Sequence, residues 1–355
     1  ALAAWLLMNL YERYPESRAS LGTTTLYEEL KIGTALMHQL ILPGQKLAIA
    51  KLHTNVPAWG PCPPHETGPC VSKTETKATY AMARTLAQLA RVHLAERQPG
   101  EARRAFDLAK TAFTNARTEP SLCRDFPDFG GEGGIYPDND VYALWREPRK
   151  DREPCHPGRD NIEDDAYSAL VEVFLASRAL ADPGTAALAK QVAAHPRFGE
   201  IDEFWWMSVA AGSLKRTCTL DDAVVLAVAA EEKARAADPK AAAAYAGRAV
   251  RVMDWILGTN AMALSMVTGF GENAVERLHD SIVRDGEPGR MALGPNNWTN
   301  AGDPDMPAFG SLPGMKMMPV KGRGWAAREI AIDGNAPLAW MAWWAEHRAA
   351  ALLAP

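Results

Sequence analysis

Two cysteines and two histidines lie near one another in a loop-rich stretch of the N-terminal half. Cys62, His65 and Cys70 share one short segment, and His53 precedes it. Thiolate sulfur and imidazole nitrogen are the ligands that zinc accepts in four-coordinate sites. A disulfide between Cys62 and Cys70 is the alternative, and it is the more ordinary outcome in an exported protein. The segment therefore predicts either a structural zinc site or a disulfide.

The placement of one glutamate in the C-terminal part of the chain would hold a carboxyl group at the mouth of a cleft. Glu329 follows a glycine-rich loop with Gly322 and Gly324, and it lies just before a helical stretch. The neighbouring Trp325 could supply apolar surroundings, which raise the pKa of a carboxyl group toward that of a useful proton donor. The alternative is a surface glutamate that the helix dipole favours at the start of a helix.

Helical spacing dominates the elements that must position these residues. Residues 75–96, for example, place Met82, Leu86, Leu89 and Val92 on one apolar stripe. Shorter stripes are expected from Leu26, Leu30, Leu36 and Leu40, and from Leu170, Val171, Phe174 and Leu175. The helices predicted in this way cover residues 1–13, 25–40, 75–96, 100–117, 162–181, 184–194, 202–215, 219–236, 239–258 and 335–353.

Three long stretches between the helices are rich in Gly, Pro, Asn and Asp: residues 54–72, 120–161 and 284–324. Loops this long are unusual in a compact domain and are often functional. Because convincing strands are scarce, paired helices with long loops on one side predict a helical toroid whose site lies on the loop face. No linker interrupts the middle of the chain, so we expect one domain over residues 1–355; a two-domain helical protein is the alternative.

Charge and hydropathy exclude two classes of partner. The net charge of the 355 residues is −5 without any basic block, which argues against nucleic acid. No apolar stretch is long enough to span a bilayer. Residues 1–13 have the pattern of a helix already under way with no capping residue before it. We therefore expect an upstream segment, on the same chain or on a separate N-terminal chain.

An ordered series of motifs fills the C-terminal third. Residues 254–260 read Asp-Trp-Ile-Leu-Gly-Thr-Asn, and residues 265–271 read Ser-Met-Val-Thr-Gly-Phe-Gly. Then follow His279, a Gly-Pro-Asn at 294–296, and Arg-Glu-Ile-Ala-Ile-Asp-Gly-Asn-Ala-Pro-Leu at 328–338. The series resembles glycoside hydrolase family nine, and looser likenesses reach through nearly the whole chain. The resemblance implies an all-α, (α/α)6 barrel with long loops forming the cleft face.

The resemblance also implies a reaction, the inverting hydrolysis of β-1,4-linked glucan by a secreted or periplasmic enzyme. Inversion needs a general acid and a general base, with carboxyl groups roughly 6.5–9.5 Å apart. By resemblance Glu329 is the acid. The family carries its base in an Asp-Ala-Gly-Asp segment, which is expected upstream of residue 1. No cofactor is required for this chemistry.

The substrate-binding residues are expected around the same loops. His279 matches a family position that contacts sugar, but Ser281 replaces the Arg that usually follows it, so Arg277 or Arg284 is expected to reach into the cleft instead. Further departures, such as Arg328 for Asn, add positive charge that would suit an anionic or modified glycan. The expected aromatic sugar platforms are Trp59, Trp145 and Trp298, with Trp325 at a family Tyr position.

Metal binding is expected on the same grounds. Some members of the family hold a structural zinc in the loop that corresponds to Cys62, His65 and Cys70, with His53 nearby. Calcium is also common in the family. The oxygen ligands of Asp138, Asn139 and Asp140 could hold it, although a short acidic cluster is usually only solvated.

Three functions stay open on the sequence alone. An endo-acting cellulase, which takes cellulose or cello-oligosaccharides, is the default within the family. An exo-acting hydrolase of cello- or chito-oligosaccharides, including glucosaminides, is the second, because the loop at 131–161 could close one end of a cleft. A non-catalytic glycan-binding protein on the same fold is the third, since the expected base is not among residues 1–355.

Overall fold

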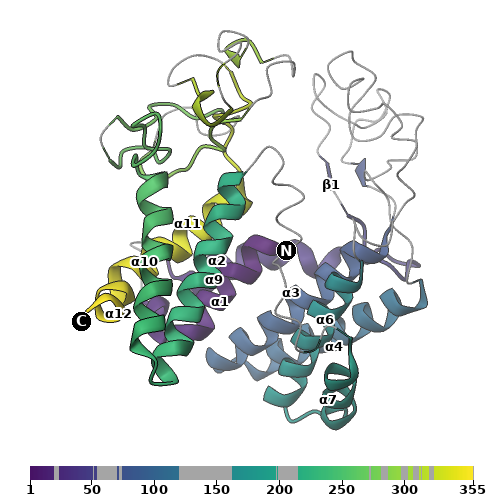
Figure 1. The fold of residues 1–355 in the computed structure, drawn as a ribbon. Coiled ribbons are helices and arrows are strands. Elements are labelled where there is room, and N and C mark those ends of the chain that lie inside the picture. Colours follow the sequence, from purple (N-terminus) through teal and green to yellow (C-terminus); the bar gives the residue numbers. More distant parts are fainter. Residues whose placement is uncertain are drawn as a thin grey trace. The chain divides into compact units, whose positions relative to one another are not determined.

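The structure is a computed structural model, and it describes residues 1–19, 24–50, 52–53, 70–71, 74–119, 162–196, 198, 215–271, 273–280, 287–296, 303–306, 312, 314–319 and 324–354. The chain divides into two compact units, residues 1–202 and 203–355. Figure 1 shows helices in both units. The expectation of a single domain stays a prediction.

The first unit is built on the long helix α3 (Thr76–Ala95), which packs against α4 (Pro99–Thr118) and α6 (Ile162–Ala179). The predicted stripe of Met82, Leu86, Leu89 and Val92 is fully buried there, as expected. The remaining elements are α1 (Leu2–Arg13), α2 (Leu26–Thr34), α7 (Thr185–Ala194), and two 3-10 turns, η1 (Pro15–Arg18) and η2 (Ala35–Gln39).

Two of the expected apolar stripes differ from the structure. Helix α2 ends at Thr34 and the chain tightens into a 3-10 turn, so Leu36 leaves the stripe and is exposed. The change from 3.6 to about three residues per turn is the physical reason. In α6 the buried face includes Ala169, Leu170 and Val173, whereas Val171, Phe174 and Leu175 are partly exposed. The small side chain of Ala169 allows α6 to pack closely through this face, whereas the predicted stripe counted only large apolar residues.

The described strands of the first unit are β1 (Leu52–His53) and β2 (Cys70–Val71). They pair antiparallel, with Leu52 opposite Val71 and His53 opposite Cys70. The ladder is too short to form a sheet layer. The described part of the chain is otherwise helical or irregular, which agrees with the predicted all-α class.

The second unit is built on a helical hairpin of α9 (Lys215–Arg235) and α10 (Pro239–Ile256). Asp238 caps α10 by accepting a hydrogen bond from the backbone N–H of Ala241 at 3.1 Å, and Pro239 suits the first turn. The last helical stretch runs through α11 (Ile332–Trp344), the π-helical turn η5 (Ala345–Ala349) and α12 (Ala350–Leu353). It begins a few residues earlier than the pattern predicted.

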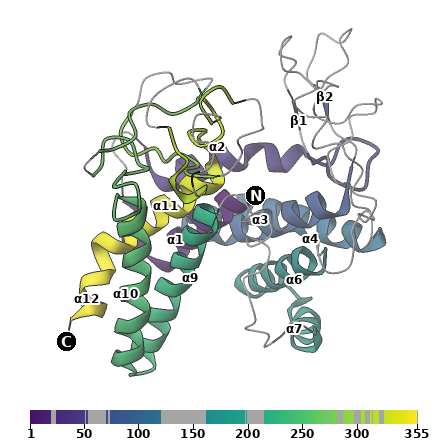
Figure 2. The ribbon, with the colours of Figure 1, turned by 45° about the horizontal axis from the view of Figure 1, so that its top comes forward.

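The described irregular segments between residues 257 and 331 gather at the end of the hairpin where α10 ends, as both ribbon views show (Figures 1 and 2). Their turns include the 3-10 turn η4 (Gly314–Lys316). Isolated backbone bridges hold this region, among them Val267 to Met291, His279 to Glu329, and Ala292 to Ile330. No helix of the described residues is both long and apolar enough to cross a membrane.

Candidate functional site

Backbone pairing brings His279 and Glu329 together. They form a parallel bridge in which the N–H of His279 donates to the carbonyl of Arg328 at 2.8 Å. The N–H of Ile330 donates back to the carbonyl of His279 at 3.4 Å, and the N–H of Leu293 donates to the carbonyl of Glu329 at 2.8 Å. The acid expected from the sequence and the expected sugar contact therefore share one small backbone ladder.

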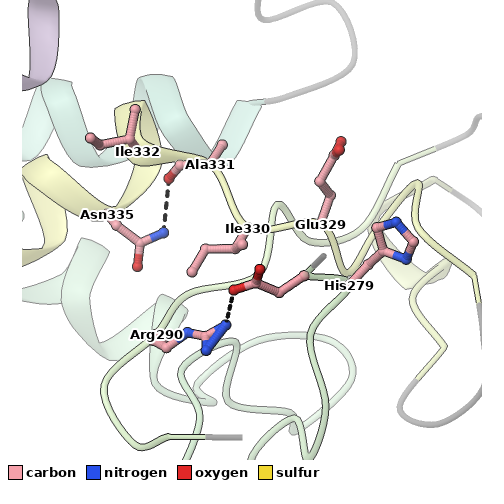
Figure 3. A pocket seen from close by; sticks show the side chains of 8 residues that line it. His279, Arg290, Glu329, Ile330, Ala331, Ile332 and Asn335 are labelled. Carbon is pink, nitrogen blue, oxygen red and sulfur yellow. Dashed lines mark hydrogen bonds and ion pairs between the residues drawn. The ribbon is translucent and has the colours of Figure 1, made fainter. Parts of the chain in front are cut away.

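A pocket of about 580 Å³ opens beside this ladder. Figure 3 shows Glu329 and His279 on one side of it, with Arg290 and Asn335 on the other. The lining combines groups that ionise or hydrogen-bond with the aliphatic chains of Ile330 and Ile332, which could contact the apolar face of a sugar ring. The residues that line the pocket are His279, Asp280, Arg290, Glu329, Ile330, Ala331, Ile332 and Asn335.

The carboxyl group of Glu329 has the electrostatics of a proton donor. Although the residue is exposed to solvent, the protein around its carboxyl group removes part of its hydration and raises its pKa. His279 opposes this shift, because an imidazolium nearby favours the carboxylate. The net direction is upward, which keeps Glu329 protonated over a wider pH range than an ordinary glutamate.

A charged pair forms another part of the pocket wall. Arg290 donates to Asp280 at 2.5 Å, and the two side chains are only 15% and 14% exposed. Nη1 of Arg290 is buried and has no hydrogen-bond partner among the residues that the structure describes. The backbone around Arg290 is fixed as well, since its N–H donates to Oγ1 of Thr268 at 3.0 Å and its carbonyl accepts from the N–H of Thr268 at 2.9 Å.

Asn335 ties the start of α11 to the strand-like segment at Met291. Its Oδ1 accepts from the N–H of Met291 at 2.9 Å, and its Nδ2 donates to the carbonyls of Met291 at 3.2 Å and Ala331 at 2.8 Å. Asn296, from the Gly-Pro-Asn motif, is buried and donates to the carbonyl of Ala326 at 2.7 Å. Both asparagines from the motifs thus act on the backbone that carries Glu329.

The structure locates only some of the residues that the sequence singled out. His279 and Glu329 line the pocket, and the carbonyl of Trp325 accepts the N–H of Glu329 at 2.8 Å. The ladder pairs the backbones of His53 and Cys70, two of the four expected zinc ligands. Within the described parts of the chain, no group of three or more His, Cys, Asp or Glu side chains forms a metal site. The expected residues outside those parts are Trp59, Cys62, His65, Asp138, Asn139, Asp140, Trp145, Arg284 and Trp298.

Sequence reasoning missed Asp280 and Arg290. Asp280 directly follows His279, so its place beside the pocket could have been inferred from that neighbour. Arg290 lies in a loop with no periodic pattern. The basic residues that the sequence indicated for the cleft were Arg277 and Arg284. The pairing of Arg290 with Asp280 depends on tertiary contacts.

Comparison with known proteins agrees with the motifs. Residues 208–342 match the sequence profile described as Glycosyl hydrolase family 9. This range contains Glu329, His279 and all of the motifs quoted for the resemblance. No curated protein sequence matched the chain.

Solved structures extend the likeness to nearly the whole chain. The family-nine endoglucanase J30 is 20% identical with a TM-score of 0.60, and the match covers 96% of this chain and 70% of that one. A Zn-binding triple mutant of the same endoglucanase is 21% identical, with the same TM-score and coverage. A single-mutant thermostable endoglucanase from Alicyclobacillus acidocaldarius is 16% identical with a TM-score of 0.56, over 100% of this chain and 72% of that one.

At these identities the solved structures show the fold alone. They share the fold of family-nine enzymes, which confirms the predicted all-α, (α/α)6 barrel. The sequence match over residues 208–342 adds the family's own motifs to that fold. Together they confirm the resemblance to glycoside hydrolase family nine.

Proposed function

We propose that this protein hydrolyses β-1,4-linked glucan with inversion and that Glu329 is its general acid. One observation carries the proposal: Glu329 lines the pocket, and the pKa of its carboxyl group is raised. A general acid must hold its proton until the glycosidic oxygen takes it, so an elevated pKa is the property that the reaction needs.

His279 is the proposed sugar contact beside the acid. Its bridge to Glu329 fixes the spacing between the two backbones. An imidazole there can donate to or accept from a sugar hydroxyl group. The exposed chain of Ile332, at the start of α11, adds an apolar surface on the same pocket. A sugar ring presents hydroxyl groups at its edge and C–H groups on its faces, and this pocket offers a partner for each.

Inversion also needs a carboxylate that activates water. Among the residues that line the described pocket, Asp280 is the other carboxylate, and its oxygen is held by Arg290. This ion pair argues against Asp280 as the base. We propose, as the resemblance to the family implies, that the base is an aspartate upstream of residue 1.

The substrate, the location and the metal content of the protein are also proposals. Its relatives by fold are described as endoglucanases, which favours internal cleavage of cellulose or cello-oligosaccharides. We propose a secreted or periplasmic enzyme that uses no cofactor in catalysis. We also propose a structural zinc, since the backbones of His53 and Cys70 pair opposite each other and both residue types are ligands that zinc accepts.

The decisive experiment compares the wild-type protein, expressed with the upstream segment that we propose, with Glu329→Gln on cellotetraose. The glutamine keeps the shape of the side chain but cannot donate the proton, so kcat should fall by about 10²- to 10⁴-fold while cellotetraose binding is retained. Proton NMR of the wild-type product should show the α-anomer first, as inversion requires. Undiminished hydrolysis by Glu329→Gln would refute the assignment of the acid.

A further inference from the structure

The backbone just before Glu329 is held by a carboxylate from a separate loop. Asp303 is 1% exposed, and its Oδ2 accepts hydrogen bonds from the backbone N–H groups of Trp325 and, at 2.6 Å, Ala326. Its Oδ1 accepts from the N–H groups of Asp305 at 2.8 Å and Met306 at 3.2 Å. One buried carboxylate thus joins the turn at 303–306 to the segment that leads into the acid.

A second carboxylate reinforces this junction. Oδ2 of Asp305 accepts from the N–H of Gly324 at 2.5 Å and lies 3.4 Å from Nη2 of Arg328. Arg328 is 2% exposed, and its Nη2 also donates to the carbonyl of Gly324 at 2.9 Å. The residue next to the acid therefore folds its side chain back over the glycine, and its charge is balanced by Asp305.

Gly324 is the residue that permits this close approach. A Cβ atom added there would lie 2.2 Å from Oδ1 of Asp303 and 2.7 Å from Oδ2 of Asp305. Contacts under 3.0 Å do not occur for real Cβ atoms, so a side chain at this position would displace both carboxylates. We call Asp303, Asp305, Gly324 and Arg328 the carboxylate clamp.

The clamp reaches Glu329 through the backbone of one residue, Trp325. The carbonyl of Trp325 accepts the N–H of Glu329 at 2.8 Å and that of Arg328 at 3.0 Å, while the N–H of Trp325 donates to Asp303. Fixing residue 325 therefore fixes the turn that aims the acid. Neither Asp303 nor Asp305 lines the pocket, so their effect on the reaction must pass through this backbone.

We propose that Asp303, supported by Asp305, is a positioning residue for the general acid Glu329. The inference rests on the proposed function. A proton donor that is displaced by about 1 Å can lose about 10²-fold in rate, whereas sugar binding elsewhere in the pocket stays intact. Loosening the clamp should thus impair protonation of the leaving group selectively.

The test uses two substrates that differ in their need for a proton. The leaving group of cellotetraose is a sugar alkoxide, which must be protonated as it departs. The leaving group of dinitrophenyl β-cellobioside is a stable phenolate, which departs without protonation. In Asp303→Asn and Asp303→Ala, kcat on cellotetraose should fall by about 10- to 100-fold with KM nearly unchanged. On the dinitrophenyl substrate kcat should stay within about twofold of the wild type.

Asp238→Ala is the matched control, since Asp238 also accepts a backbone N–H within the same unit but caps α10. It should leave kcat on both substrates unchanged. Circular dichroism and urea unfolding report whether each variant is folded. If the Asp303 variants do not fold, the same two substrates are tested with Asp305→Asn. The side chain of Asp305 is 25% exposed, so this change should destabilise the fold less.

Equal loss on both substrates in a folded variant, or no loss on either, would overturn the positioning role. The proposed function fails separately: wild-type protein would then turn over neither substrate, or Glu329→Gln would retain full activity on cellotetraose. A clamp variant that loses only cellotetraose turnover, beside an inactive Glu329→Gln, supports both proposals.

Discussion

The carboxylate clamp and a charged cluster in the first unit are both largely buried, but they are built from different bonds. In the cluster, Arg91 of α3 donates to both carboxylate oxygens of Glu12 in α1, at 2.7 and 2.9 Å. It also contacts Glu172 of α6 at 2.7 Å, and Trp5 donates to the same carboxylate at 2.8 Å. In the clamp, by contrast, Asp303 accepts its hydrogen bonds from backbone N–H groups.

The difference follows from what each cluster must hold. The helices of the first unit satisfy their own backbone groups, so only side chains remain to link α1, α3 and α6. The segment before Glu329 has no regular ladder, and its N–H groups need partners that lie outside it. A carboxylate is well suited to this task because it accepts several hydrogen bonds at once. Side-chain pairs thus fix how finished helices pack, whereas carboxylate–backbone bonds fix the path of the chain itself.

The largest effect is expected when the side-chain cluster loses its cation. Arg91→Met removes the cation that bridges the partly exposed Glu12 and the buried Glu172, and leaves Glu172 with the charge of Arg84 alone, which should lower the free energy of unfolding by about 3 kcal/mol. Urea denaturation measures this loss. Neutralising the partners as well, in Glu12→Gln/Arg91→Met/Glu172→Gln, should recover much of it. A loss under about 1 kcal/mol for the single variant would mean that the cluster is not desolvated enough to matter.

Gly324→Ala tests how tightly the clamp is packed. The added methyl group meets both carboxylates, and relieving that clash should lower the free energy of unfolding by about 1–3 kcal/mol. Gly33→Ala is the control: this glycine lies in α2 with open space around its Cβ position, so the change should stabilise the protein by about 0.5–1 kcal/mol. Thermal unfolding of the two variants should therefore move in opposite directions.

The smallest effect is expected from the charge of His279. Glu329 must be protonated to act, so kcat should fall as the pH rises through its elevated pKa. A protonated His279 lowers that pKa, and His279→Gln removes this influence. The alkaline limb of the kcat profile on cellotetraose should therefore shift toward higher pH. A shift toward lower pH, or none, would show that His279 does not act on the acid through its charge.

Helices whose apolar residues recur at helical spacing could be predicted from the sequence. The hydrogen bonds that join one loop to another could not. The stripe of α3 could be read directly, because Met82, Leu86, Leu89 and Val92 recur at helical spacing. Glu329 and His279 were found through the motifs rather than through any period. The link from Asp303 to Trp325 had no local signal, since a hydrogen bond to a backbone N–H leaves no mark on the identity of the residue that donates it.

The pair of Asp280 and Arg290 also has a practical meaning for engineering. It joins the two ends of the stretch from 281 to 289, while His279 is anchored to Arg328, and Met291 to Val267 and Asn335. Because these two ends are already held together, replacing the chain between them by a segment of another length costs little entropy. A library that varies only residues 281–286 would therefore leave the anchors of Glu329 unchanged.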